Sequence, residues 1–197
     1  MFDTDGPQYS SEEKVIGNII YSVRFKYIYG DYDNVYAKIR DVYNCQIKKC
    51  TSSDAIIKLP NTEIRMYDFF SSYKKWDYPS GSIRVSGVAE NAFDGCKNLK
   101  NVVLSENSTF IGASAFKGCK SLETIEFPDS LRRICENAFS GCKSLKTVTV
   151  PKEIYYIADS AFATGNPDFV LCGSNRVAKK YAKKNNINYQ KVKRKRS

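Results

Sequence analysis

Apolar positions recur along the second half of the chain with a fixed period of 23 residues. An Ala-Phe pair, a Gly-Cys-Lys triplet and a leucine keep this spacing from one repeat to the next. The recurring residues are Ala92-Phe93, Ala115-Phe116, Ala138-Phe139 and Ala161-Phe162, with Gly95-Cys96-Lys97, Gly118-Cys119-Lys120 and Gly141-Cys142-Lys143, and Leu99, Leu122 and Leu145. A period in the low twenties with leucine-like residues at fixed offsets is typical of a solenoid built by stacking one structural unit. A solenoid presents an extended surface and has no inherent catalytic pocket.

One repeat predicts a short strand followed by a turn. Ile125 and Phe127 alternate with Thr124 and Glu126, so the first pair points inward and the second outward. Pro128 ends the strand because it cannot donate to the ladder. The later segment 136–141 is too short for a standard helix, and we expect a helical turn on the convex side of the solenoid, closed by a glycine.

The two ends of the chain depart from the repeat. We expect a disordered segment at 1–14 and a β-rich N-terminal capping region at 15–81, with strands near 19–25, 36–42 and 55–59 and an aromatic insertion at 67–78. The repeats occupy 82–168. A C-terminal cap follows at 169–190, with a strand, a helix and a last short strand, and a basic disordered tail covers 191–197.

The C-terminal helix is predicted from one apolar face. Val177, Ala178, Tyr181 and Ala182 lie together at helical spacing, and lysines occupy the other faces. Ser174 or Asn175 would cap its start.

The net charge of +10 lies in one segment. Between Arg176 and Arg196 there are ten lysines or arginines and no acidic residue, so the rest of the chain is neutral. This distribution argues against a general polyanion binder. The tail could contact nucleic acid, an anionic wall polymer or an import receptor, or could simply be a solvated end. Few aromatic residues interleave it, so nucleic acid is disfavoured.

Nothing in the N-terminal sequence resembles a secretory signal peptide, and no apolar run is long enough to span a membrane. The compartment is left open between the cell surface and the cytoplasm.

The seven cysteines form an odd set without a Cys-x-x-Cys pair. Cys96, Cys119 and Cys142 share one repeat position beside a buried phenylalanine, where unpaired cysteine acts as a small apolar residue. We expect mostly free thiols, while Cys45 and Cys50 could close a small loop in an extracellular protein.

The motif Ala-Phe-x-Gly-Cys-x-x-Leu, followed by a short strand and often a proline, resembles the BspA-type leucine-rich repeat. The closing segment 173–189 is similar to the C-terminal cap of that family. The resemblance covers about 82–190 and, less specifically, 15–81. It implies a right-handed leucine-rich-repeat solenoid, frequently on bacterial or protist surfaces, where some members act as adhesins for host matrix proteins or other cells. It brings no catalytic motif.

The residue types and motifs of the chain do not indicate an enzyme. The chain has no histidine, which excludes histidine-dependent nucleophilic, acid–base and metal chemistry. No Gly-rich phosphate loop is present. Glu123, Glu126 and Asp129 fit a solvated strand face better than an acid–base pair. We therefore expect no enzyme, no cofactor, no metal site and no small-molecule substrate.

The binding hypothesis has two candidate surfaces for a protein ligand. The first is the outward strand face, where stacked repeats align Asn101, Val103, Thr124, Glu126, Thr147 and Thr149. The second is the aromatic insertion, with Tyr67, Phe70, Tyr73 and Trp76. The favoured function is a non-enzymatic protein-binding module in surface adhesion or host interaction; the alternative is an intracellular interaction, immunity or regulatory partner. The oligomeric state is left open.

Overall fold

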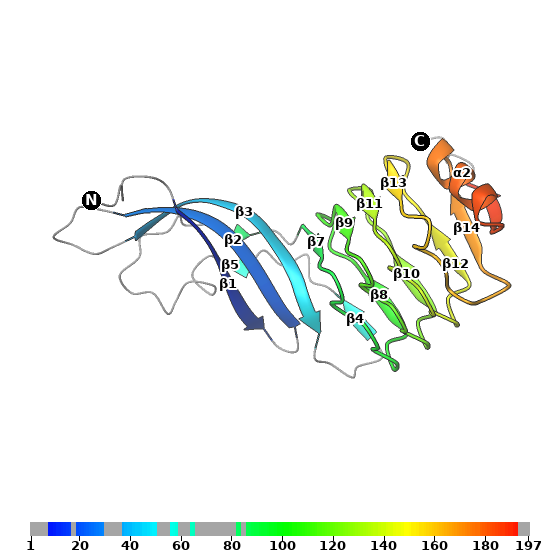
Figure 1. The fold of residues 1–197 in the computed structure, drawn as a ribbon, viewed down its shortest axis with the longest axis horizontal. Helices are drawn as coiled ribbons and strands as arrows, with labels where there is room; N and C mark the ends of the chain where they lie inside the picture. The colour runs from blue at the N-terminus through cyan, green and yellow to red at the C-terminus, as the bar shows by residue number, and fades with distance from the viewer. Residues whose placement is uncertain are drawn as a thin grey trace.

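The computed structural model describes residues 8–16, 19–29, 37–50, 56–58, 64–65, 82–83 and 86–192, and side chains are described for 86–192. Within these residues the chain forms a β-solenoid whose coils stack along the long axis of the molecule (Figure 1). Each coil contributes one short strand to each of two sides, and the 23-residue step moves the chain from one coil to the next.

The first side of the solenoid is a parallel sheet with two residues per strand. Neighbouring strands pair in register, so that Phe110 lies opposite Arg133 and Ile111 opposite Ile134. Its strands are β7 (Gly87–Val88), β9 (Phe110–Ile111), β11 (Arg133–Ile134) and β13 (Tyr156–Ile157).

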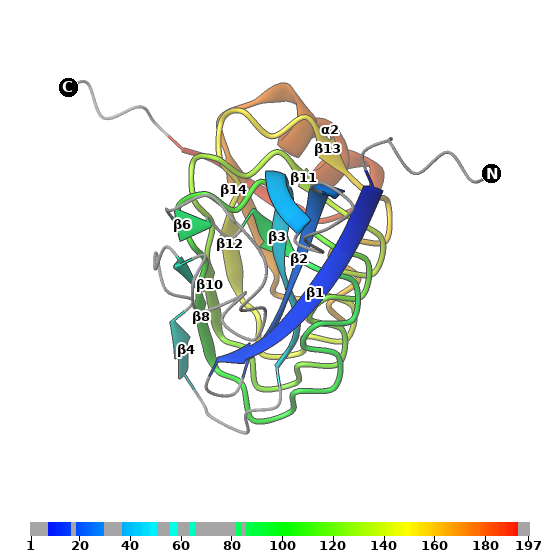
Figure 2. The ribbon, with the colours of Figure 1, turned by 90° about the vertical axis from the view of Figure 1, so that its left-hand side faces the viewer.

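The second side carries longer strands that start near the leucine of each repeat. Viewed along the stack, β8, β10 and β12 lie one behind another on one side of the molecule (Figure 2). Its strands are β4 (Ile56–Lys58), β8 (Asn101–Val103), β10 (Thr124–Glu126), β12 (Thr147–Thr149), β14 (Val170–Gly173) and β15 (Asn188–Lys191). All of the pairings found among them are parallel.

A stack of phenylalanines fills the interior, as the repeat predicts. Phe93, Phe116, Phe139 and Phe162 are at most 3% exposed. Successive ring centroids lie 4.8, 5.4 and 5.1 Å apart, with the rings within 12° of parallel. Each coil thus covers the aromatic ring of the coil before it, which explains why no coil can bury its apolar residues alone.

The Ala-Phe segments form a third side made of turns. Ser140 N–H donates to Asn137 O at 3.0 Å, and Gly141, with φ of 73°, ends the turn in the left-handed region. The expected helical turns are therefore single hydrogen-bonded turns. Backbone bonds also connect neighbouring coils here: Phe116 N–H donates to Ala138 O at 2.9 Å.

Two of the repeated cysteines, Cys119 and Cys142, donate thiol hydrogen bonds between coils. Cys119 Sγ lies 3.1 Å from Phe93 O, and Cys142 Sγ lies 3.1 Å from Phe116 O. Burial raises the pKa of both thiols, that of Cys142 from 9.0 to about 12. In the part of the chain with described side chains, none of Cys96, Cys119, Cys135, Cys142 and Cys172 forms a disulfide.

A small loop closed by Cys45 and Cys50, the option left open for an extracellular protein, is not compatible with the fold. Both residues belong to β3 (Ala37–Cys50), opposite Val23 and Ile19 of the neighbouring strand. Five residues of extended chain span about 16 Å, whereas a disulfide requires Cα atoms within about 7 Å. The two cysteines therefore cannot pair with each other.

The N-terminal part is an antiparallel meander of β1 (Gln8–Ile16), β2 (Ile19–Tyr29) and β3 (Figure 1). It joins the solenoid where β3 pairs in parallel with β7, Ile47 opposite Val88. The prediction of a disordered segment at 1–14 is wrong from Gln8 onward. The polar sequence of β1 suits an edge strand, because the backbone ladder to β2 holds it.

A small antiparallel pair of strands flanks the predicted aromatic insertion in the sequence. In this pair, β5 (Ile64–Arg65) lies against β6 (Ser82–Ile83). The segment between the two strands, with all of the predicted aromatic contact residues, lies outside the described residues.

The C-terminal part has a helix, α2 (Arg176–Lys184), between β14 and β15. Asn175 caps it, because its side chain accepts a hydrogen bond from Ala178 N–H at 2.9 Å. Ala178, Tyr181 and Ala182 are buried, as the apolar face predicts. The basic tail was placed too early, since Lys191 still pairs with Gly173 in the last ladder.

Candidate binding surfaces

The predicted outward face aligns side chains in two columns on the paired strands β8 and β10, and β12 begins a neighbouring sheet in the next coil. Asn101 lies opposite Thr124, and Val103 opposite Glu126, with the buried Val102 and Ile125 between them. Thr147 and Thr149 follow on β12 with the same exposed–buried–exposed pattern. We call the six predicted residues the polar strip. Its four members on β10 and β12 are exposed, and the two on β8 are half-buried.

Interactions within the polar strip fix its geometry. Thr124 Oγ1 donates to Asn101 Oδ1 at 2.6 Å, which joins the first column across two coils. Glu126 is the one carboxylate among the six residues. The strip therefore offers hydroxyl, amide and carboxylate groups on two neighbouring sheets, which suits recognition by hydrogen bonding.

The two columns continue beyond the residues that the period identifies. On the sheet of β12, the half-buried Val170 and the buried Cys172 of β14 lie opposite Thr147 and Thr149, and Asn188 and Gln190 of β15 come next. Sequence reasoning missed these positions because the Gly-Cys-Lys register ends before β14. The parallel pairing of β14 with β15, which are separated in sequence by α2, cannot be predicted from repeat spacing.

A second surface lies on the sheet of β9, β11 and β13. The guanidinium carbon of Arg133 lies 5.2 Å from the centre of the Phe110 ring, a cation–π contact. Next in the same column, Tyr156 donates its hydroxyl to Glu136 Oε1 at 3.0 Å. That hydrogen bond raises the pKa of the Tyr156 hydroxyl.

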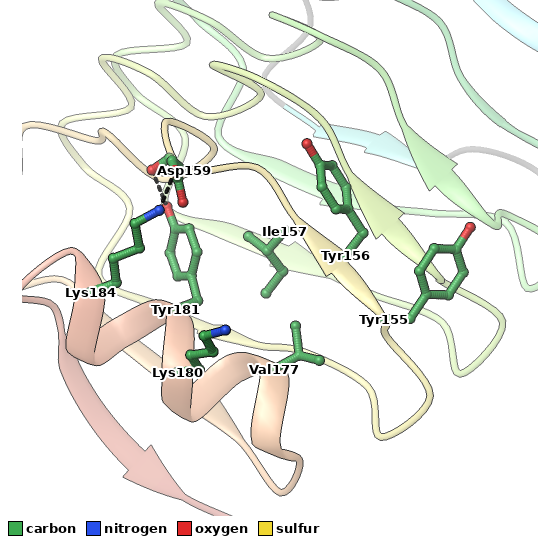
Figure 3. Close-up of a pocket in the computed structure, with 8 residues that line it drawn as sticks. All are labelled: Tyr155, Tyr156, Ile157, Asp159, Val177, Lys180, Tyr181 and Lys184. Carbon is green, nitrogen blue, oxygen red and sulfur yellow. Dashed lines mark hydrogen bonds and ion pairs between the residues drawn. The ribbon is translucent and has the colours of Figure 1, made fainter.

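This second surface ends in a pocket between β13 and α2, with a volume of about 280 Å³ (Figure 3). Its floor carries Ile157 and Val177, and the side chains around it come from both elements. The lining residues are Tyr155, Tyr156, Ile157, Asp159, Val177, Lys180, Tyr181 and Lys184. Lys184 pairs with Asp159 on the rim.

The pocket was not predicted, although the sequence carried a signal for it. Tyr155 and Tyr156 occupy positions that hold Arg132 and Arg133 in the previous repeat. Such mismatches between repeats mark outward positions that the scaffold does not require. The two tyrosines form a pocket only together with side chains of α2, and the sequence does not show that α2 lies beside them.

No group of three or more histidine, cysteine or acidic side chains in the described part of the chain could hold a metal ion. None of the described helices is long and apolar enough to cross a membrane.

Comparisons with known proteins identify the repeat. A family model described as the BspA-type leucine-rich repeat region matches residues 62–190 in six copies. No protein with curated annotation matches the chain.

Solved structures share the fold at low sequence identity. A leucine-rich repeat protein from Bacteroides capillosus ATCC 29799 is 18% identical, with a TM-score of 0.55 over 83% of this chain and 99% of that one. A leucine-rich repeat protein from Bacteroides ovatus ATCC 8483 is 20% identical, with a TM-score of 0.53 over 82% of this chain. The chain spans 37% of the length of the B. ovatus protein.

Proposed function

Because this chain belongs to the BspA-type leucine-rich repeat family, we propose that it is a non-enzymatic module that binds a protein partner through the polar strip. The observation that carries the proposal is the set of exposed polar side chains on β10 and β12, Thr124, Glu126, Thr147 and Thr149, on either side of the buried Ile125 and Val148. Solenoids use extended surfaces of this kind for recognition.

The dimensions of the strip suit an extended protein surface. The strip covers one strand in each of three successive coils, β8, β10 and β12, which is about 10 Å at about 4.8 Å per step. Small hydroxyl and amide side chains leave the strip flat, so a partner can approach closely and form direct hydrogen bonds. A protein interface carries about one such bond per 100–200 Å².

The non-catalytic part of the proposal rests on the chemistry of the strip. The chain has no histidine, and Glu126 is the one carboxylate among the six residues. A general acid–base pair would need a second titratable group within reach of the same substrate atom.

We further propose that the two ends close the repeat array. Tyr181 on α2 packs edge-on against Phe162 with ring centroids 5.9 Å apart, which covers the end of the phenylalanine stack. At the other end, β3 continues the sheet of β7 into the antiparallel meander. Arrays of stacked repeats need such terminal units to shield the core.

For the cellular role, we propose adhesion or host interaction at the cell surface, where members of this family frequently lie. An intracellular interaction or regulatory protein is the second candidate. The cysteines favour the second candidate, because five of them form no disulfide in the described part and Cys45 cannot pair with Cys50. Disulfides rather than free thiols are usual in secreted proteins.

The strip is tested by capture from host matrix extract and from lysate of the source cell, followed by substitution. Glu126→Lys combined with Thr149→Lys adds three positive charges to the strip and should weaken binding of the captured protein at least tenfold. The matched control, Asp94→Lys with Ala163→Lys, adds the same charge at exposed positions of the turn side. Equal loss in both double variants, or no loss in either, would show that the strip is not the site.

The compartment is tested by counting thiols. Protein isolated from the source cell without reductant and then unfolded should show all seven thiols if it is intracellular. Fewer thiols would favour export, with bridges to partners other than the 45–50 pair.

A further inference from the structure

We propose that the pocket between β13 and α2 binds an acidic segment of a partner protein, with one apolar side chain of that segment seated on Ile157 and Val177 (Figure 3). This second interaction surface goes beyond the polar strip. It lies on a different sheet, so the two proposals stand or fall separately.

The first observation is the concentration of exposed aromatic side chains at this pocket. Among the described side chains, the large hydrophobic residues that are exposed are Tyr155 at 65%, Tyr156 at 43% and Val192 at 40%. Both tyrosines line the pocket, and they are adjacent in sequence. Tyrosine is enriched at binding hot spots because its ring supplies a large, rigid contact area.

The second observation is the charge of α2. The helix α2 carries five basic residues and no acidic one. All five basic side chains are exposed: Arg176, Lys179, Lys180, Lys183 and Lys184. The only carboxylate in the pocket lining, Asp159, already pairs with Lys184. Within the described part of the chain Lys180 has no ion pair, which leaves its ammonium group available to a ligand carboxylate.

A second cation lies on the far side of the tyrosines. Arg133 occupies the strand position opposite Tyr156 and is exposed, with its guanidinium over Phe110. A bound segment that crosses from α2 to β11 would pass Lys180, the two tyrosines and then Arg133. Acidic residues on either side of one apolar residue match this order of groups.

The size of the pocket indicates a side chain rather than a whole small molecule. Its volume of about 280 Å³ lies just below the range of about 300–1,000 Å³ typical of small-molecule sites. Ile157 is buried and Val177 half-buried, so the floor is apolar but shallow. One leucine-sized or aromatic side chain fits this description.

The neighbouring acids favour a peptide over a nucleic acid. Glu136 holds the Tyr156 hydroxyl, and Asp159 stands on the rim, so two carboxylates border the tyrosines. A phosphodiester backbone carries a regular row of negative charges that cannot avoid both of them. A peptide can place its acidic residues beside Lys180 and Arg133 and its neutral residues beside the carboxylates.

A random dodecamer peptide library displayed on phage tests the inference with the full chain as bait. The enriched peptides should contain acidic residues flanking a leucine or an aromatic residue. Their synthetic forms should bind in fluorescence anisotropy, and binding should weaken at least tenfold in Tyr155→Ala and in Lys180→Glu. Lys146→Glu, which makes the same charge change on β12's side of the solenoid, should leave binding within twofold, and so should Glu126→Lys with Thr149→Lys.

The inference is overturned if no peptide is enriched, if the enriched peptides lack acidic residues, or if both pocket variants bind as well as the parent. It is also overturned if an oligothymidylate of equal charge displaces the peptide at equal concentration. Both altered side chains are exposed, so the variants should keep the parental melting temperature. A variant that melts early is replaced by Tyr155→Ser or Lys180→Gln, for which the same loss of binding is expected.

Discussion

The hydroxyl of Tyr181 accepts a hydrogen bond from the backbone N–H of Phe162 at 3.0 Å. In the earlier coils the corresponding N–H of Phe93, Phe116 and Phe139 donates to a carbonyl of the next coil at 2.7–2.9 Å. Phe162 lies in the last such coil, and the side chain from α2 supplies the acceptor instead. The same hydroxyl donates to Asp159 O at 3.2 Å.

Replacing Tyr181 by phenylalanine should therefore destabilise the fold although the ring remains. The change leaves the buried N–H of Phe162 without a partner, which costs about 1–3 kcal/mol. Chemical denaturation of Tyr181→Phe measures the loss. Tyr155→Phe removes a hydroxyl from an exposed ring and should change stability by less than about 0.5 kcal/mol. Equal effects in the two variants would contradict the role given to the Tyr181 hydroxyl.

The buried thiol of Cys142 should make stability depend on alkaline pH. Burial raises its pKa from 9.0 to about 12, so between these values the folded chain keeps a proton that the unfolded chain releases. Stability is fully present below pH 9 and falls as the pH rises toward 12, by about 1 kcal/mol at pH 10 from this group.

The comparison that isolates Cys142 is the slope of stability against pH. Cys142→Ala lowers stability at pH 8 by leaving space in the core, but its unfolding free energy should fall less between pH 8 and pH 10 than that of the parent. Identical slopes would mean that the thiol titrates alike in the folded and unfolded chains.

Ser108 occupies a position in the core that favours an apolar residue. It is fully buried, and its Oγ has no hydrogen-bond partner in the structure. The same repeat position holds Leu131 and Ile154, which are also buried. Ser108→Ala should stabilise the fold by about 1 kcal/mol, because it removes an unpaired polar atom.

Ser105 provides the contrast for this prediction. It is also buried, but its Oγ accepts a hydrogen bond from Asn107 N–H at 3.5 Å. Ser105→Ala should therefore leave stability unchanged or lower it. A melting temperature that falls in Ser108→Ala would show that the hydroxyl has a partner, such as a buried water.

Ser114 adopts a left-handed backbone conformation, with φ of 53°, at a position where two other repeats have asparagine. Asn91 and Asn137 have φ of 57° and 55°, and asparagine tolerates this region better than most residues. Ser114→Asn should raise stability by about 0.5 kcal/mol and Ser114→Gly by a similar amount. Thermal melts of both variants test the expectation, and a decrease in both would contradict it.

The 23-residue period predicted the interior of the repeats but not how their ends are closed. Phe139 and Ile134 could be placed inside because each recurs in neighbouring coils. The acceptor role of Tyr181 depends on the distance between α2 and the last coil, which no spacing encodes. The strand β1 was missed for a related reason, since its polar residues are held by backbone pairing to β2.

The candidate sites divide along the same line. Thr124 and Glu126 were predicted to face outward from strict alternation, and they do. Tyr155 and Tyr156 could be recognised as part of a pocket only in the structure, because the pocket also needs Val177 and Lys180 of α2, some twenty residues later in the chain. A pocket formed by two separate elements leaves no period in the sequence.

The hydrogen bonds between coils have a mechanical consequence. The strands run across the stack, and the bonds that join them point along its long axis (Figure 1). A pulling force between the meander and β15 would load these ladders one after another, as in opening a zipper, rather than all together in shear. Coils should then detach singly under tension, so the array would yield gradually and extend in steps of one repeat.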